Sequence, residues 1–365
     1  MWTGPDVPYQ DLPPLPPSTQ VETPAVLKEV IAASRALAAL DQAVRRLPDP
    51  TMLVHLLPVL EAQASSEIEN VVTTNDELFR AAADMPDTRT SPAVKEALRY
   101  RRALWVGFDS LQTRPLTSGT ALEICSELQG RTATLRNQPG TYIGNPVNRE
   151  RIYTPPEGAD VIAEHLSGWE RFLHADSGFD PLVVMAMQHY QFEAIHPFFD
   201  GNGRTGRVIN LLLLVEKGLL EQPVLYLSGH IVRTKDEYYS RLRAVTAQDD
   251  WQGWILYMVG AVGATARWTL SLVEVIEGLR REAEDAIRRH LPAQAPASDL
   301  ARVLFAQPYV RIEAIVDAGL AKRQTASKWL SVLAQHDVLE RQQLGRSVVY
   351  LNRALLDTLA EATDR

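Results

Sequence analysis

Cysteine is almost absent from this 365-residue chain, which contains only Cys125. A single cysteine cannot form an internal disulfide or a cysteine-based metal site, so the composition predicts a protein of a reducing compartment, the cytoplasm. We expect Cys125 to be a small buried residue in the apolar segment 121–128.

Long apolar runs and excess positive charge are also missing. No stretch of 18 or more apolar residues occurs, and the N-terminus lacks the charged-then-apolar pattern of a signal peptide. The 37 Lys and Arg residues face 45 Asp and Glu residues, a net charge of −8. These features argue against a membrane protein and against a chain built chiefly to coat nucleic acid. With 45% hydrophobic residues, the chain can form one large domain and a smaller one.

The most informative stretch is a polar, glycine-containing turn, HPFFDGNGRTGR, at 196–207. Apolar segments flank it on both sides, at 181–195 and 208–215. Each segment is long enough for a helix and is apolar on nearly all sides. The sequence therefore predicts a mainly all-α fold with these two helices at its centre.

Chemically, this turn suits a nucleotide and its metal. Residues 201–203 lead into a helix N-terminus, where glycines allow close approach and backbone N–H groups attract anions. Arg204 and Arg207, three residues apart, would flank the same anion. Asp200 is a carboxylate for Mg²⁺, and His196 has a pKa suited to proton transfer. A helix-ending histidine is usually a cap and Gly-Asn-Gly usually a tight turn, but neither explanation covers all twelve residues.

The turn resembles the pattern His-x-Phe-x-Asp/Glu-Gly-Asn-Gly-Arg-x-x-Arg of the Fic (Fido) family at every defining position. The resemblance implies transfer of AMP from ATP, with Mg²⁺, to a Ser, Thr or Tyr hydroxyl of a target protein or of the chain itself. It implies that His196 deprotonates the hydroxyl, that Asp200 holds the metal and that Phe198 anchors the loop. It assigns the α- and β-phosphates to Gly201, Asn202, Gly203 and Arg204, and the γ-phosphate to Arg207.

A second segment, at about 60–70, resembles the inhibitory pattern Ser/Thr-x-x-x-Glu-Gly/Asn of Fic proteins that carry an N-terminal inhibitory helix. Ser65, Glu69 and Asn70 occupy its defining positions. We predict that Glu69 pairs with Arg207 and displaces the triphosphate, which would autoinhibit the enzyme. Without the resemblance, this segment is simply the solvated acidic end of a helix.

Two further features are interpreted through the resemblance. Segments 140–146 and 151–156 predict a short hairpin, and in Fic proteins such a flap docks the target backbone. Its edge would be Thr141, Tyr142, Ile143 and Gly144, although a merely structural loop is the alternative.

The adjacent tyrosines Tyr238 and Tyr239 point to different helix faces, so at most one can pack fully inward. The resemblance places both at the adenine and ribose end of the pocket, where core-plus-surface packing is the alternative. Thr246 stands where part of the family has Asn, which weakens this assignment.

We predict three segments: 1–110 with the inhibitory helix, a catalytic core at 111–290 and a C-terminal domain at 291–365. Proline-rich residues 1–22 predict an extended arm packed on its own domain, with a ligand for a partner's groove as the alternative. Thr23 and Pro24 predict a helix start.

The C-terminal segment predicts a winged helix, with helices at 299–306, 312–318 and 325–335 and strands at 338–341 and 347–351. Its nine Lys and Arg residues against eight Asp and Glu residues give a balance of +1, far below the basic charge of a committed DNA binder. Protein recognition and support of a homodimer are the other roles open to this segment.

Two competing functions remain for the whole chain. One is removal of AMP by the same site, and the other is an ATP-sensing DNA-binding regulator. No membrane partner is expected.

Overall fold

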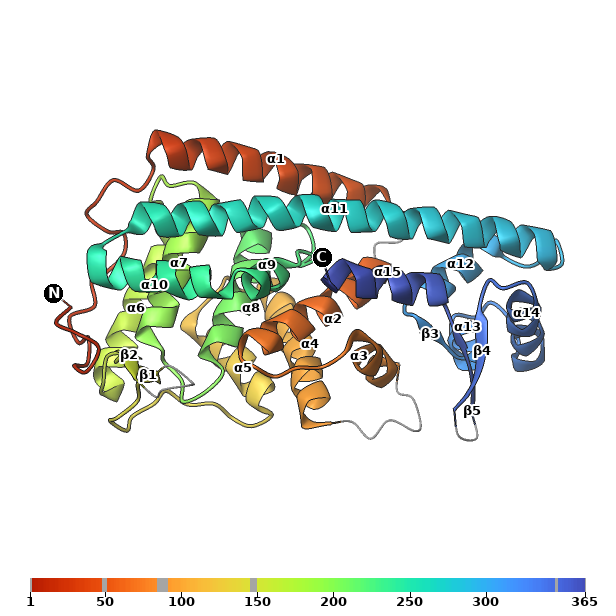
Figure 1. Cartoon of the computed structure of the whole chain (residues 1–365), viewed down its shortest axis with the longest axis horizontal. Helices are drawn as coiled ribbons and strands as arrows, with labels where there is room; N and C mark the ends of the chain where they lie inside the picture. The colour runs from red at the N-terminus through yellow and green to blue at the C-terminus, as the bar shows by residue number, and fades with distance from the viewer. Residues whose placement is uncertain (1, 48–50, 84–90, 145–149, 345–346, 365) are drawn as a thin grey trace. The chain divides into compact units, whose positions relative to one another are not determined.

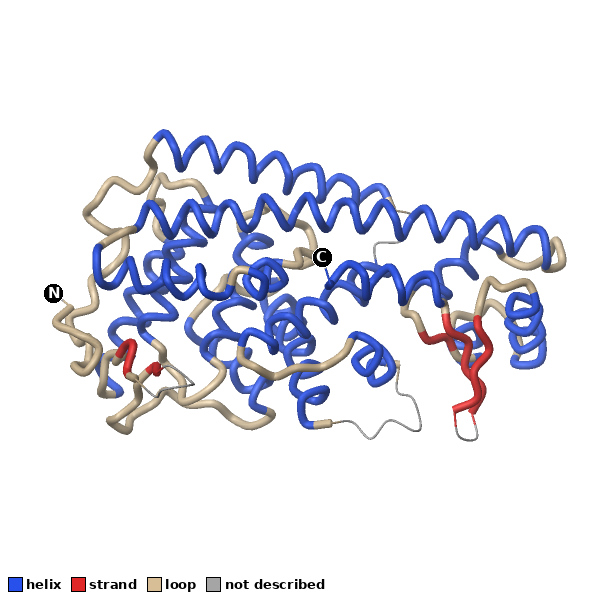
Figure 2. The backbone as a smooth tube through the Cα atoms, in the orientation of Figure 1, coloured by secondary structure: helices blue, strands red, loops and turns tan. Residues whose placement is uncertain are grey.

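The structure is a computed structural model that describes residues 2–47, 51–83, 91–144, 150–344 and 347–364. Helices dominate the described residues, as the tube in Figure 2 shows. The predicted fold class, mainly α with a small hairpin, is confirmed. The chain forms two compact units, the first made of residues 1–38 and 99–266 and the second of 39–98 and 267–365. The predicted division into 1–110, 111–290 and 291–365 follows chain order instead, and stays a prediction.

Helices make up most of the first unit (Figure 1). Three of its helices also have residues in the second unit: α1 (Pro24–Arg46), α4 (Pro92–Leu111) and α11 (Trp251–His290). The others are α5 (Ser118–Gln129), α6 (Ala159–His174), α7 (Pro181–Ile195), α8 (Asn202–Glu216), α9 (Leu227–Arg233) and α10 (Lys235–Gln248). The predicted start of α1 is confirmed, because Thr23 Oγ1 accepts a hydrogen bond from the Val26 N–H.

Helices α7 and α8 form the core of this unit, as predicted. Every residue of α7 except Pro181 and Glu193 is buried, and α7 packs against both α6 and α8. Asp180 caps α7 by accepting from the Leu182 N–H at 2.8 Å, and Pro181 fits the first helical position. Because α7 and α8 are both buried on nearly all sides, packing holds the two helices in place, and the turn at 196–201 connects them.

The predicted hairpin is confirmed as β1 (Ile143–Gly144) paired antiparallel with β2 (Arg151–Tyr153). Residues 145 and 146 of the predicted first strand lie outside the described residues. A two-stranded ribbon needs support, and the Tyr153 hydroxyl supplies it by donating to Ala194 O of α7 at 2.8 Å.

The N-terminal arm packs on its own unit, as expected. Tyr9 donates its N–H to Thr154 O at 3.0 Å, next to β2, and Gln191 of α7 donates to Pro13 O at 2.9 Å. Leu12 is buried. The arm therefore braces the flap strand rather than standing free.

The second unit contains the C-terminal elements and the helices before α4: α2 (Thr51–Ile68), α3 (Asn75–Ala82), α12 (Ala297–Phe305), β3 (Tyr309–Val310), α13 (Ile312–Asp317), α14 (Arg323–Gln335), β4 (Glu340–Leu344), β5 (Ser347–Leu351) and α15 (Arg353–Asp364). The three strands form an antiparallel sheet in the order β3-β5-β4. The predicted C-terminal helices and strands are present within a few residues, whereas β3 and α15 were not predicted.

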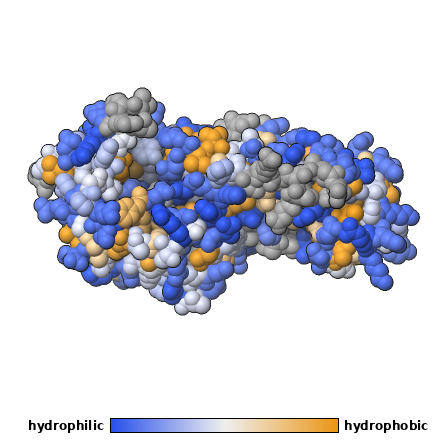
Figure 3. Space-filling model, turned by 90° about the horizontal axis from the view of Figure 1, so that it is seen from below, coloured by the Kyte–Doolittle hydropathy of each residue, from blue (hydrophilic) through white to orange (hydrophobic). Residues whose placement is uncertain are grey.

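Helix α11 is long and apolar enough, by length and composition alone, to cross a membrane. More than half of its most apolar window is buried within the chain, as in the core helix of a soluble domain. On the face drawn in Figure 3, hydrophobic side chains occur in small groups among hydrophilic ones. This view therefore does not single out one large apolar surface.

Candidate active site

His196 occupies the C-cap position of α7 in a left-handed conformation, with φ 49° and ψ 59°. Its N–H donates to Phe192 O at 3.0 Å, the last hydrogen bond of the helix type. The left-handed turn stops α7 and sends the chain into the loop. The residue is half-buried, and Nδ1 of its imidazole is buried.

Phe198 and Asn202 hold the loop in shape. Phe198 is 1% exposed and its ring packs on Phe192, with 6.3 Å between ring centroids. The Asn202 side chain accepts from the Phe198 N–H and donates to the Phe198 carbonyl, both at 2.8 Å. Phe198 is thus the buried aromatic that was expected. The Asn202 side chain is thus engaged with the loop through both its oxygen and its nitrogen.

Asp200 presents its carboxylate to solvent, with 70% of the side chain exposed. Oδ1 accepts from the Gly201 N–H at 2.7 Å and from Arg204 at 3.3 Å. Among the described residues, Oδ2 has no hydrogen-bond partner, and no group of three His, Cys, Asp or Glu side chains could hold a metal by itself. A single available carboxylate oxygen fits Mg²⁺, which binds one or two carboxylates together with substrate phosphates.

Gly201 is the N-cap of α8, with φ 82° and ψ 9°, and contributes no side-chain cap. This left-handed conformation favours glycine. The first turn of α8 therefore begins without a side-chain acceptor, and its N–H groups and helix dipole together make an anion site.

Arg204 and Arg207 both lie on the first turns of α8 and are 6% and 1% exposed. Between these two arginines in the sequence, α8 approaches α7 closely at Gly206, where a Cβ atom would lie only 2.5 Å from Glu193 Oε1. His189 of α7 belongs to the same region, and its Nε2 is 2.8 Å from the Tyr238 hydroxyl. Burial first, and then the charge of Arg207, lowers the pKa of His189 to about 3. His189 is therefore neutral near pH 7.

The two tyrosines divide as expected, with Tyr238 1% and Tyr239 42% exposed. Only Tyr239 presents its ring to a ligand, so the placement of Tyr238 at a nucleotide would need this buried ring to move. Thr246 lies 3.0 Å from the Tyr190 hydroxyl through its Oγ1. Thr246 thus hydrogen-bonds to a residue of α7.

The structure adds two residues that the sequence did not point to. Gln129, at the end of α5, donates to Asp200 O at 2.9 Å and to Cys125 Sγ at 3.2 Å. Arg136 is completely buried and donates from Nε to His196 O at 2.6 Å. The contacts with Asp200 and His196 join residues at least sixty positions apart, and neither segment has a motif that would predict them.

The predicted inhibitory residues lie at the end of α2. Ser65 is buried in its last turns, Glu69 is exposed just beyond Ile68, and Asn70 adopts φ 63°. These residues belong to the second unit, while the loop at 196–201 belongs to the first. The pairing of Glu69 with Arg207 stays a prediction.

The predicted flap edge includes Thr141 and Tyr142, which precede β1, and Ile143 and Gly144, which form it. The Tyr142 ring is 43% exposed and lies under the Arg151 guanidinium, 4.7 Å from it. Docking of a target on this edge stays a prediction.

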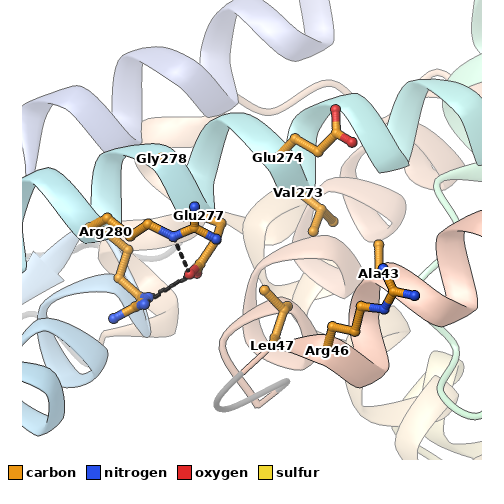
Figure 4. A pocket seen from close by; sticks show the side chains of 9 residues that line it. Ala43, Arg46, Leu47, Val273, Glu274, Glu277, Gly278 and Arg280 are labelled. Carbon is orange, nitrogen blue, oxygen red and sulfur yellow. Dashed lines mark hydrogen bonds and ion pairs between the residues drawn. The ribbon is translucent and has the colours of Figure 1, made fainter.

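A pocket of about 450 Å³ lies elsewhere, within the second unit between the end of α1 and α11 (Figure 4). Glu277 and Arg280, which are bonded to each other, line one side, and Arg46 and Leu47 line another. None of the predicted site residues lines this pocket.

Family models match residues 27–109 (Fic/DOC family N-terminal), 115–214 (Fic/DOC family) and 279–355 (Protein adenylyltransferase SoFic-like, C-terminal domain). "Protein adenylyltransferase Fic" from Culex quinquefasciatus is 32% identical over 111 residues, which are 29% of this chain and 21% of that protein. "Protein adenylyltransferase fic-1" from Caenorhabditis elegans is 32% identical over 119 residues, 29% and 22% of the two chains. This chain thus spans about a fifth of the length of these curated relatives.

Two solved structures share the fold. A Fic family protein from Desulfovibrio desulfuricans G20 has a TM-score of 0.55 at 21% identity, covering 93% of this chain and 98% of that one. Fic-1 (residues 134–508) from C. elegans has a TM-score of 0.53 at 20% identity, covering 69% and 74%. At these identities the likeness concerns the fold alone.

Proposed function

Because this chain belongs to the Fic/DOC family, we propose that it is a protein adenylyltransferase that moves AMP from ATP to a Ser, Thr or Tyr hydroxyl of a target protein or of itself. One observation carries the proposal. Within nine residues, the loop combines a half-buried His196, an exposed Asp200 carboxylate and the uncapped N-terminus of α8. The curated relatives named above as protein adenylyltransferases support it.

The reaction assigns one role to each group. His196 would take the proton of the target hydroxyl as its oxygen attacks the α-phosphorus. The bond from the α-phosphorus to the bridging oxygen would break, and pyrophosphate would leave with that electron pair. Mg²⁺, when bound at Asp200, would neutralise phosphate charge.

Phosphate binding falls to α8. The N–H groups of residues 202–204 and the Arg204 guanidinium would bind the α- and β-phosphates. Arg207 would bind the γ-phosphate. Its guanidinium is 1% exposed in this structure, so a nucleotide would reach it only after a rearrangement. We further propose, as a separate point, that Glu69 pairs with Arg207 in the resting enzyme and displaces the triphosphate.

We also propose that the C-terminal helices and strands form a winged helix. The order α12, β3, α13, α14, β4, β5 and the antiparallel β3-β5-β4 sheet support this assignment. The net balance of +1 over 291–365 does not favour DNA as its principal partner.

The test is transfer of label from α-labelled ATP with Mg²⁺, using the purified chain alone and with a lysate. We expect labelled protein with the Glu69→Gly chain, none with His196→Ala, and unchanged labelling with His336→Ala, an exposed histidine outside the loop. Release of AMP from pre-labelled protein by the wild-type chain would instead indicate the reverse reaction. Labelling that persists in His196→Ala would overturn the proposed base.

A further inference from the structure

Arg136 is a buried charge whose nearby carboxylate, Glu157, acts on it electrostatically but forms no direct ion pair with it. It lies in the irregular segment between α5 and β1, is 0% exposed, and makes no salt bridge among the residues that the structure describes. Burial lowers the pKa of its guanidinium. A buried cation without a directly paired carboxylate is costly, so the hydrogen bonds that keep it there are informative.

Those contacts go to three consecutive carbonyl groups at the end of α7. Nη2 donates to Ile195 O at 3.0 Å, Nε donates to His196 O at 2.6 Å, and the backbone N–H donates to Pro197 O at 2.9 Å. The last carbonyls of a helix lack partners within it and carry the negative end of its dipole. The cation is therefore stabilised where the catalytic histidine leaves the helix.

We propose that Arg136 is the positioning residue that holds His196 in its working orientation; this inference rests on the proposed function. His196 has a left-handed conformation that side-chain-bearing residues avoid. Its N–H is fixed by Phe192 and its carbonyl by Arg136, so both of its backbone polar groups are anchored. Together these bonds define the direction in which the imidazole leaves the backbone.

The same guanidinium also contacts the flap. Nη2 donates to Pro156 O, three residues after β2 ends at Tyr153. Arg136 thus connects the end of α7 to the chain that leads from the proposed target-docking hairpin. A target hydroxyl delivered by the flap would arrive in a fixed register with the imidazole that accepts its proton.

An arginine suits this position because its planar guanidinium directs several N–H groups along fixed directions, whereas a lysine ammonium is a single point. Arg136→Lys keeps the positive charge and removes the planar set of N–H donors. A matched control exists in Lys217, which donates to Leu173 O at 3.1 Å, in the last turn of α6. Lys217→Met removes a cation from a helix end that does not carry the histidine.

The experiment measures kcat and KM for ATP in the Glu69→Gly chain, or in the wild type if that is the more active. We expect Arg136→Lys to lower kcat by about 100-fold, the effect of a misplacement of about 1 Å, with KM for ATP nearly unchanged. Lys217→Met should lower thermal stability without lowering kcat. Unchanged kcat per folded molecule in Arg136→Lys, or a loss confined to KM, would overturn the inference.

A second readout does not need activity. Hydrogen–deuterium exchange of peptides covering 192–204, without nucleotide, should be faster in Arg136→Lys than in the wild type and unchanged in Lys217→Met. If Arg136→Lys does not fold, Arg136→Gln, which keeps a planar N–H donor, is measured in the same two assays. If no chain transfers AMP, the proposed function fails, while the exchange experiment still decides whether Arg136 holds His196.

Discussion

His189 and His196 belong to the same helical segment but differ in environment. His189 is completely buried beside Tyr238 and Trp254, whereas His196 is half-buried at the helix end. The lowered pKa of His189, about 3, keeps this imidazole neutral. Of the two, only His196 combines exposure with a place in the loop.

The buried histidine predicts a pH-dependent stability. The unfolded chain protonates this group near pH 6.5, whereas the folded chain does so only near pH 3. Its contribution is therefore complete above pH 6.5 and is lost as the pH falls below that value. We expect the free energy of unfolding to fall by about 2 kcal/mol from this group between pH 6.5 and 5.

His189→Gln removes the titration. Loss of the hydrogen bond to Tyr238 changes the free energy of unfolding by an amount that does not depend on pH. Urea unfolding at several pH values therefore separates this change from the effect of titration. If the free energy of unfolding of His189→Gln depends on pH as strongly as that of the wild type, His189 is not the group that titrates.

Cys125 should be an inert thiol. Burial raises its pKa to about 11, and the thiolate is the reactive form. We expect no reaction of the native chain with Ellman's reagent at pH 8 and one thiol per chain in guanidinium. Rapid modification of the native chain would show that α5 opens beside Asp200.

At the residue scale, the sequence predicted those site residues that lie close together along the chain. The motif at 196–207 fixed the loop residues because their spacing along the chain is also their arrangement in the turn. Arg136 and Gln129 reach the loop from positions 60 and 71 residues away. No local pattern marks such contacts, so only the folded backbone could show them. The side-chain role of Asn202 was hidden for a different reason, because its partner is a backbone group that carries no sequence signal.

Among the elements, α3 is a short helix that depends on its ends. Thr74 and Glu77 form a capping box at its N-terminus. Arg80 donates to the Tyr309 hydroxyl at 3.0 Å, and Asn75 donates to Leu359 O at 3.4 Å. The helix that directly follows the predicted inhibitory segment is therefore fastened to β3 and α15.

Thr74→Ala should destabilise α3 by about 1 kcal/mol, the usual cost of losing an N-cap. We expect faster hydrogen exchange in residues 75–82. Thr325→Ala, at an exposed threonine of α14, is the control and should leave exchange in 75–82 unchanged. Equal protection in wild type and Thr74→Ala would show that the tertiary contacts alone hold the helix.

The predicted elements were those with a repeating pattern. The start of α1 and both ends of α12 and α14 lie within about three residues of their predicted positions. The two-residue strand β3 escaped prediction because it exists only through pairing with β5, where Tyr309 faces Leu351. Short strands of this kind carry too few residues for periodicity.

At the scale of the whole molecule, neither compact unit is one continuous stretch of the sequence. Helices α1, α4 and α11 each have residues in both compact units. The segment that carries Glu69 belongs with the C-terminal elements. Composition cannot predict this grouping, because the contacts that define it join residues hundreds of positions apart, such as Asn75 and Leu359.

Glu69→Gly is the prediction that involves both units. If the carboxylate occupies the γ-phosphate position at Arg207, its removal should raise AMP transfer at least about fivefold, within the usual range of regulatory coupling. Initial rates at saturating Mg²⁺ measure the effect. Glu67→Gly, a half-exposed residue two positions earlier, is the matched control. Equal rates in the two variants would remove Glu69 from regulation.

The two hydrogen bonds between the Asn202 amide and the Phe198 backbone have a consequence for chemical ageing. Asn202 is followed by Gly203, the pair in which an asparagine most readily cyclises onto the next backbone nitrogen and deamidates. With its amide held at both ends and its backbone in the first turn of α8, that ring cannot close. The folded chain should therefore keep its asparagine during storage, and damage at this position would record molecules that have spent time unfolded.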